Sequence, residues 1–214
     1  MSKKLVSILG DSISSYQGIS DDASANSTLL VNPCYYKEPF PLEKTYWMRI
    51  INDLELNLCV NNSWSGGNLS GRSDESAGVN RANHLSRDSG EKPDIIILFM
   101  GMNDLGRGVD VNVFAEDYAH ALIIIKEAFP LAKVCCVNMP DRDIFLKKRA
   151  EMFNKAIENA VKEAGENFFI ADLYNSRLNN DFYYMNTLDG LHPDEDGMRI
   201  IGEIVEEAIK QNIS

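Results

Sequence analysis

The chain has 214 residues, 44% of them hydrophobic and 25% charged, which is the size and composition of one globular domain covering residues 1–214. Its 32 acidic residues against 21 basic ones give a formal net charge of -11, which repels phosphate backbones and anionic lipid surfaces. We therefore expect neither nucleic acid nor a membrane as a partner, while the sequence leaves the oligomeric state open.

Short apolar runs and helical patterns alternate along the chain. The apolar runs have the length of strands and are rich in branched or aromatic residues; they lie at 5–9, 56–60, 95–100, 134–137 and 168–171. Apolar side chains at three- and four-residue steps predict helices at 45–53, 114–129, 145–164 and 195–212. The strands lack polar alternation, which is typical of strands covered on both faces. This order predicts an α/β fold, a doubly wound five-stranded parallel sheet between helices.

Residues 15–44 follow neither pattern. This segment contains Pro33, Pro39 and Pro41 and has no regular spacing of apolar residues. Irregular segments of this length are commonly functional, so we interpret 15–44 as a candidate wall of a substrate site, with disorder as the alternative.

Targeting and cofactor signals are missing from the sequence. The apolar run at 5–9 is too short for a secretory signal, and no run approaches the roughly 20 apolar residues of a membrane-spanning helix. The four cysteines have no CxxC spacing, and the glycine-rich stretch 66–71 lacks the Gly-Lys-Ser/Thr ending of a phosphate-binding loop. We therefore expect a cytoplasmic protein that uses no metal and no cofactor.

Polar groups with complementary chemistry follow four of the predicted strands. Ser12 follows the first strand, Gly66 the second and Asn103 the third. Asp189 and His192 lie in a loop after the fifth. Because ligands of parallel sheets bind beyond the carboxyl ends of the strands, we expect these groups at one edge of the sheet.

These groups are the ones that acyl transfer requires. Ser12 is the candidate nucleophile, His192 the base that takes its proton, and Asp189 the carboxylate that orients the imidazole. The backbone amides of Ser12 and Gly66 and the side-chain amide of Asn103 are the candidate oxyanion donors. The structural alternatives are that Ser12 caps a helix after its strand and that Asn103 caps a turn.

Four segments around these residues resemble the blocks of the SGNH hydrolases, also called GDSL esterases and lipases. The sequence Gly-Asp-Ser-Ile at 10–13 is similar to the first block, with isoleucine where the family name has leucine. The segments 62–66, 101–104 and 189–193 are similar to the second, third and fifth blocks. The resemblance implies a three-layer α/β/α, flavodoxin-like fold without a cofactor. It also implies the following site: nucleophile Ser12, oxyanion donors Ser12, Gly66 and Asn103, base His192 and orienting acid Asp189.

The resemblance implies a serine esterase that acts on a small carboxylic ester through an acyl-enzyme on Ser12. The lack of a long apolar lid favours a short, acetyl-type acyl group, and the aromatic residues of 15–44 favour a carbohydrate-like alcohol. Trp64, inside the second block, is a candidate substrate contact. An acyltransferase, a lysophospholipase or a thioesterase could use the same site. A binding protein of this fold without activity is a further alternative.

Overall fold

The structure is a computed structural model that describes residues 3–20, 33–140, 146–178 and 186–213. Its centre is a five-stranded sheet in the order β2-β1-β3-β4-β5, in which all neighbouring strands are parallel. The strands are β1 (Leu5–Gly10), β2 (Asn57–Ser63), β3 (Ile95–Phe99), β4 (Lys133–Val137) and β5 (Phe168–Ala171). This arrangement confirms the predicted α/β fold, and the strand order is the flavodoxin-like one.

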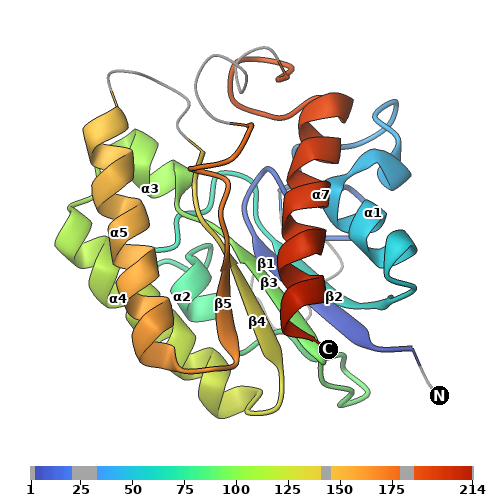
Figure 1. Ribbon diagram of the computed structural model, residues 1–214, viewed down its shortest axis with the longest axis horizontal. Coiled ribbons are helices and arrows are strands. Elements are labelled where there is room, and N and C mark those ends of the chain that lie inside the picture. Colours follow the sequence, from blue (N-terminus) through green and yellow to red (C-terminus); the bar gives the residue numbers. More distant parts are fainter. Residues whose placement is uncertain (1–2, 21–32, 141–145, 179–185, 214) are drawn as a thin grey trace.

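Helices cover both faces of the sheet (Figure 1). On one face α1 (Tyr46–Asp53) and α7 (Glu195–Asn212) pack against each other. On the other face lie α2 (Gly78–Arg81), α4 (Val111–Ala128) and α5 (Lys147–Ala164). The short α3 (Met102–Arg107) follows β3 directly, and a 3-10 helix, η2 (Leu42–Lys44), precedes α1. The result is a three-layer molecule.

Side-chain caps set where the main helices begin. Thr45, Asp110 and Asp194 stand immediately before α1, α4 and α7, and each side chain accepts a hydrogen bond from a backbone N–H of the first turn. Such caps satisfy amide groups that have no partner inside the helix, and each stabilises it by about 1 kcal/mol. The helices that the apolar periodicity predicted therefore also have defined starting points.

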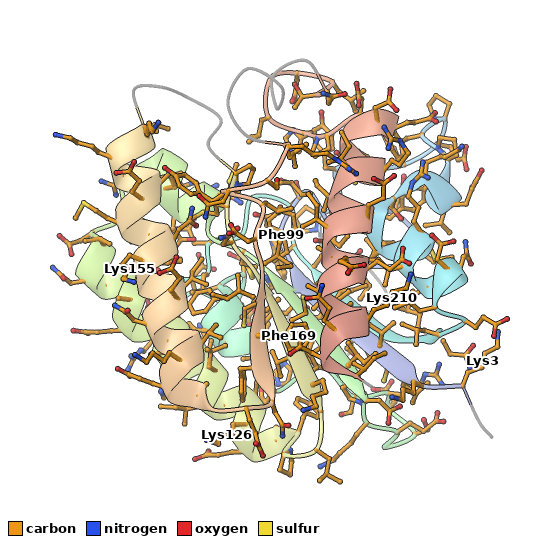
Figure 2. The ribbon with its side chains drawn as sticks, viewed as in Figure 1. Lys3, Phe99, Lys126, Lys155, Phe169 and Lys210 are labelled. Carbon is orange, nitrogen blue, oxygen red and sulfur yellow. The ribbon has the colours of Figure 1, made fainter. Side chains whose placement is uncertain are left out.

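The apolar core lies on both sides of the sheet. All five residues of β3, the central strand, are buried, because β1 and β4 flank it and helices cover both of its faces. In Figure 2 Phe99 and Phe169 lie among the layers, whereas Lys126, Lys155 and Lys210 extend from the outer helices. Burying one large apolar side chain contributes about 1.5–3 kcal/mol, so this core accounts for much of the driving force for folding.

The structure differs from the sequence-based expectation in its short elements. β2 continues to Ser63 and so contains Asn61, whose side-chain amide donates to the Ser14 carbonyl at 3.0 Å. The helices α2 and α3 and the helix η2 were not predicted, because elements of three to six residues are too short to show an apolar period. Phe145, at the predicted start of α5, lies outside the described residues.

Candidate active site

The site lies where the sheet changes its direction of winding. β1 has β2 on one side and β3 on the other, and doubly wound sheets leave a crevice at such a point, beyond the carboxyl ends of the strands. Ser12 follows β1, Gly66 follows β2 and Asn103 is the second residue of α3, directly after β3. Asp189 and His192 lie in the loop that enters α7.

A tight turn at the end of β1 presents Ser12. Gly10 must be a glycine, because a Cβ at this position would lie 2.4 Å from the Cβ of Ser14. Asp11 closes the turn, since its Oδ1 accepts the Ile13 N–H at 2.9 Å and its carbonyl accepts the Ser14 N–H at 3.2 Å. The strand end is therefore rigid, and it holds the Ser12 hydroxyl at the edge of the sheet.

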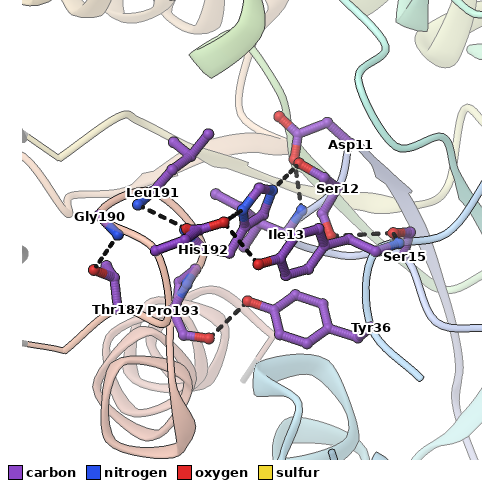
Figure 3. Close-up of polar contacts among 12 residues, drawn as sticks. Asp11, Ser12, Ile13, Ser15, Tyr36, Thr187, Gly190, Leu191, His192 and Pro193 are labelled. Atoms are coloured by element: carbon purple, nitrogen blue, oxygen red, sulfur yellow. Dashed lines mark hydrogen bonds and ion pairs between the residues drawn. The ribbon is translucent and has the colours of Figure 1, made fainter. Parts of the chain in front are cut away.

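One chain of hydrogen bonds joins the two ends of the sequence (Figure 3). The His192 Nε2 lies 3.0 Å from the Ser12 Oγ, and the His192 Nδ1 lies 2.8 Å from the Asp189 Oδ2. An ionised carboxylate only accepts hydrogen bonds, so the Nδ1–H donates to Asp189 and leaves Nε2 to accept the Ser12 proton. The structure thus brings together the predicted nucleophile, base and acid in the order that acyl transfer uses.

The Asp189 carboxylate accepts four hydrogen bonds. Its Oδ1 accepts the backbone N–H groups of Leu191 at 3.0 Å and His192 at 2.8 Å. Its Oδ2 accepts the His192 Nδ1–H at 2.8 Å and the Tyr35 hydroxyl at 2.7 Å. Burial raises the pKa of Asp189, but these hydrogen bonds outweigh burial and hold the pKa well below its usual range. The group stays ionised while it orients the imidazole.

Tyr35 contacts both members of this pair. Its ring stacks on the His192 imidazole, with the centroids 3.4 Å apart and the planes at 12°. Its hydroxyl donates to Asp189, as described above. Sequence reasoning placed Tyr35 only among the aromatic residues of a substrate wall. Tyr35 stands next to Tyr36 in a proline-rich segment, and nothing in this local sequence indicates a contact with His192, which lies 157 positions away.

The candidate oxyanion donors follow the ends of neighbouring strands. Gly66 has φ +78°, a conformation that favours glycine, in the turn closed by the Gly67 N–H and the Trp64 carbonyl at 2.9 Å. Neither the Ser12 nor the Gly66 backbone N–H has a hydrogen-bond partner within the described part of the chain. The Asn103 Nδ2 donates to the Gly67 carbonyl at 3.0 Å and lies 3.4 Å from the Asp11 Oδ2. Donation by Asn103 to a substrate oxygen therefore requires release of the longer of these two contacts.

A pocket of about 160 Å³ opens beside the Ser12 hydroxyl. Asn103 and Met102 line it from α3, and Leu191 lines it from the loop before α7. The remaining lining residues are Asp11, Ser12, Ile13, Gly106 and Arg107. Trp64, the predicted substrate contact, is not among them; its side chain is buried with 9% exposed.

The aromatic segment 15–44 is described at 15–20 and 33–44, while its middle, 21–32, lies outside the described residues. Tyr35, Tyr36 and Phe40 line a second cavity, of about 660 Å³, between this segment and the loop before α7. The Tyr36 hydroxyl donates to the Pro193 carbonyl at 2.7 Å, which ties the segment to the residue after His192 (Figure 3). The predicted wall therefore lies against the site.

Two ionisable groups, Asp11 and Arg81, are buried beside the turn that carries Ser12. Asp11 is 1% exposed, and burial raises the pKa of its carboxyl group to about 7, although the charge of Arg81 opposes this shift. Arg81 is 4% exposed, and burial lowers the pKa of its guanidinium to about 10, against the opposing effect of Asp11. The sequence indicates no functional role for Asp11 or for Arg81. A charged residue in a four-residue helix gives no sign of its burial.

We expect the Asp11→Asn substitution to change how stability depends on pH. Because the pKa is about 7 in the folded protein and near 3.8 otherwise, only the folded state holds this proton between about pH 4 and pH 7. Wild-type stability therefore falls as pH rises through this window, by at most about 4 kcal/mol from this group. In urea unfolding, the free energy of unfolding should fall less between pH 4.5 and pH 7.5 for Asp11→Asn than for the wild type. An equal loss in both proteins would contradict the burial argument.

No group of side chains suited to hold a metal ion occurs among the described residues. Within the same ranges, no helix has the length and apolar character needed to cross a membrane. The cytoplasmic location and the single-domain organisation stay predictions.

A three-layer fold with a Ser-His-Asp hydrogen-bond chain at its switch point is the architecture of a class of serine hydrolases. The chain belongs to the GDSL-like lipase/acylhydrolase family, whose model matches residues 4–209. It is therefore an enzyme of the carboxylic-ester hydrolase class. No curated protein sequence matches the chain significantly.

Several solved structures share the fold. A protein of the GDSL-like lipase group from Bacteroides ovatus is 21% identical, with a TM-score of 0.75 over 99% of this chain and 100% of that one. A psychrotrophic esterase from Pseudoalteromonas is 16% identical, with a TM-score of 0.65 over 98% of each chain. A carbohydrate esterase family 2 enzyme from Corynascus thermopiles is 20% identical, with a TM-score of 0.66 over 99% of this chain and 67% of that one. At these identities the likeness concerns the fold.

Proposed function

We propose that the protein hydrolyses a small carboxylic ester, with a short, acetyl-type acyl group on a carbohydrate-like alcohol, through an acyl-enzyme on Ser12. The observation that carries this proposal is the hydrogen-bond chain from the Ser12 Oγ through His192 to Asp189, with distances of 3.0 and 2.8 Å. A nucleophile, a base and an orienting acid at these distances need little rearrangement to react.

In the first step the Ser12 Oγ attacks the carbonyl carbon of the ester while its proton moves to the His192 Nε2. Asp189 remains ionised, as its low pKa requires, and stabilises the imidazolium through Nδ1–H. When the tetrahedral intermediate collapses, the bond between the carbonyl carbon and the alcohol oxygen breaks. The imidazolium then returns its proton to that oxygen, and the alcohol leaves.

In the second step water replaces the alcohol. The His192 Nε2 takes a proton from the water molecule, whose oxygen attacks the acyl-enzyme carbonyl. Collapse of the second intermediate breaks the bond to the Ser12 Oγ, which regains the proton from the imidazolium. The products are the carboxylic acid and the free enzyme, so the protons balance over the cycle.

Both intermediates carry a negative oxygen that needs hydrogen-bond donors. The backbone N–H groups of Ser12 and Gly66 are the first two in this proposal, and the Asn103 side-chain amide is the third. Preorganised donors of this kind each contribute about 100- to 1000-fold in rate. Support for this assignment comes from their positions after the ends of β1, β2 and β3, which are neighbours in the sheet.

Three observations support the proposed substrate. The pocket beside Ser12, of about 160 Å³, has room for a small acyl group. The larger cavity on the far side of Tyr35 carries aromatic rings, on which sugar rings commonly stack, and it is a candidate site for the alcohol. One structure with the same fold is that of a carbohydrate esterase.

The length of the acyl group tests this proposal. We expect kcat/KM to fall about tenfold or more from phenyl acetate to phenyl octanoate, because the longer chain does not fit the pocket beside Ser12. The Leu191→Ala variant removes part of the pocket wall and should recover activity on the longer ester. Leu188→Ala, in the same loop, changes the larger cavity and not this pocket; as the matched control it should keep the wild-type ratio of the two kcat/KM values, because both esters carry the same phenyl group. Equal rates on both esters in the wild type would contradict the short-acyl assignment.

The alcohol is tested separately, with acetylated monosaccharides and acetylated xylan compared with phenyl acetate. Release of acetate from the sugar esters at a kcat/KM at least equal to that for phenyl acetate supports the carbohydrate assignment. Turnover of phenyl acetate without release of acetate from the sugar esters would contradict the carbohydrate assignment and indicate a general esterase. Lack of turnover on all esters, together with no labelling by a phosphonate probe, favours the non-catalytic alternative.

A further inference from the structure

Tyr35 contacts the two residues that activate the nucleophile. Its ring lies flat on the His192 imidazole, with 3.4 Å between the centroids, and its hydroxyl donates to the Asp189 Oδ2 at 2.7 Å. This is the same oxygen that accepts the His192 Nδ1–H at 2.8 Å. One side chain thus fixes both the carboxylate and the plane of the imidazole.

The position of Tyr35 is itself held from the nucleophile side. Its backbone N–H donates to the Ser15 Oγ at 2.8 Å, and the Ser15 hydroxyl donates to the Ser12 carbonyl at 3.1 Å. The neighbouring Tyr36 packs edge-on against Tyr35, with centroids 5.0 Å apart, and is tied to Pro193 by its hydroxyl. Tyr35 therefore bridges the turn that carries Ser12 and the loop that carries the catalytic pair.

We propose that Tyr35 is a positioning residue of the Asp189–His192 pair, which orients the carboxylate through its hydroxyl and the imidazole through its ring. This inference rests on the proposed function, because it assigns a role within the same site. It goes further by adding a fourth side chain to the hydrogen-bond chain and by placing a residue of the 15–44 segment in it.

The two contacts of Tyr35 have opposite effects on the protonation of the His192 imidazole. A hydroxyl that donates to Asp189 withdraws negative charge from the carboxylate and so weakens its hold on the imidazolium. The face of an aromatic ring attracts a cation and so favours the imidazolium. Burial, aided by the hydrogen bond to Asp189, raises the pKa of Tyr35 to about 12, so the hydroxyl remains a donor at neutral pH. Removing the hydroxyl and removing the ring should therefore shift the protonation of His192 in opposite directions.

Two substitutions separate these contributions. Tyr35→Phe removes the hydroxyl and keeps the ring, whereas Tyr35→Leu removes both. We expect Tyr35→Phe to lower kcat/KM for phenyl acetate about tenfold, the usual effect of losing a hydrogen bond to a charged group. The acid limb of its pH profile should move to higher pH. Tyr35→Leu should lose more activity, and its acid limb should lie below that of Tyr35→Phe.

Tyr16→Phe is the matched control. Tyr16 belongs to the same segment, and its hydroxyl donates to the Phe40 carbonyl at 2.7 Å and lies 3.4 Å from the Glu38 Oε1, but it does not bond Asp189 or His192. This variant should keep the wild-type profile. Other charged or titratable groups line the two cavities next to the site, and none of them is substituted in the three variants: Asp11, Tyr36, Lys37, Glu38, Arg107, Asp194, Glu195 and Asp196. Differences between the profiles therefore report on Tyr35.

A second measurement does not depend on turnover. The chain has three histidines, so the His192 ring signals can be followed by NMR as pH is varied. We expect His192 to titrate at higher pH in Tyr35→Phe than in the wild type, and at lower pH in Tyr35→Leu than in Tyr35→Phe. Wild-type titration of His192 in both variants, with both proteins folded, would overturn the inference.

The failure of the proposed function would look different. In that case the wild type would show no Ser12-dependent turnover, while the NMR titrations would still decide whether Tyr35 orients the pair. If turnover is present and Ser12-dependent but both Tyr35 variants keep the wild-type pH profile and kcat/KM, the proposed function stands and the role of Tyr35 is wrong.

Discussion

Replacing Ser12 by alanine is expected to lower kcat on phenyl acetate by about 10⁴- to 10⁶-fold, the range that removal of a serine nucleophile costs in comparable triads. The substitution removes the oxygen that attacks the ester in the proposed mechanism, and the His192 Nε2, 3.0 Å away, loses its hydroxyl partner. Covalent labelling by a phosphonate probe should disappear with the activity. Steady-state kinetics and mass spectrometry of the labelled protein measure the two effects.

Ser14→Ala provides the matched control for this prediction. Ser14 lies in the same turn and is buried, and its hydroxyl bonds the Tyr46 hydroxyl at 2.7 Å, whereas the Ser12 hydroxyl bonds His192. Its loss leaves a buried polar group without this partner, which costs about 1–3 kcal/mol of folding free energy. We therefore expect Ser14→Ala to lose stability and keep most of its activity, the reverse of Ser12→Ala. If Ser12→Ala kept the wild-type kcat, the assignment of Ser12 as the nucleophile would be wrong.

Replacing Arg81 by methionine is expected to reduce the free energy of unfolding by about 3–5 kcal/mol, the usual cost of breaking a buried charged network. The guanidinium donates to the carbonyls of Gly10 at 3.0 Å and Ser76 at 3.0 Å and to that of Asn62. Methionine matches the length of the side chain but donates to none of these oxygens. It also leaves Asp11 without its buried counter-charge. Urea unfolding monitored by circular dichroism measures the loss.

Arg87→Met is the control for Arg81. Arg87 also bonds backbone carbonyls, those of Leu58 and Cys59, but 36% of its side chain is exposed and water can replace it. Its substitution should cost less than about 1 kcal/mol. If Arg81→Met and Arg87→Met had the same free energy of unfolding, the hydrogen bonds of Arg81 would not stabilise the fold as predicted.

The fold was predictable because its signals are local. Each strand is an apolar run, and each long helix repeats apolar residues at helical steps. Both patterns can therefore be recognised in the sequence without knowing which segments pack together. The candidate site was predictable for a related reason. Parallel strands place their carboxyl ends at one edge, and this rule collects Ser12, Gly66 and Asn103 whatever the distances between them in sequence.

The remaining parts of the site depend on contacts that no local pattern encodes. Tyr35 meets His192 because an irregular segment folds across the sheet edge, and Arg81 is buried because three strand-end and loop carbonyls need its donors. The orientation of Asn103 is also a tertiary outcome, since its amide is engaged by Gly67 and Asp11. Residue types alone indicate what these side chains can do but not which partners they find.

The separation of Ser12 and His192 in the sequence has a consequence for how the enzyme is made. The two residues lie 180 positions apart, so during synthesis the proposed nucleophile emerges long before its proposed base. His192 reaches Ser12 only when the loop before α7 is in place, and α7 itself packs against α1, β4 and β5. A nascent chain that has completed the first four strands therefore carries a serine without a base. Under the proposed mechanism, esterase activity therefore reports that the loop before α7 has reached its folded position.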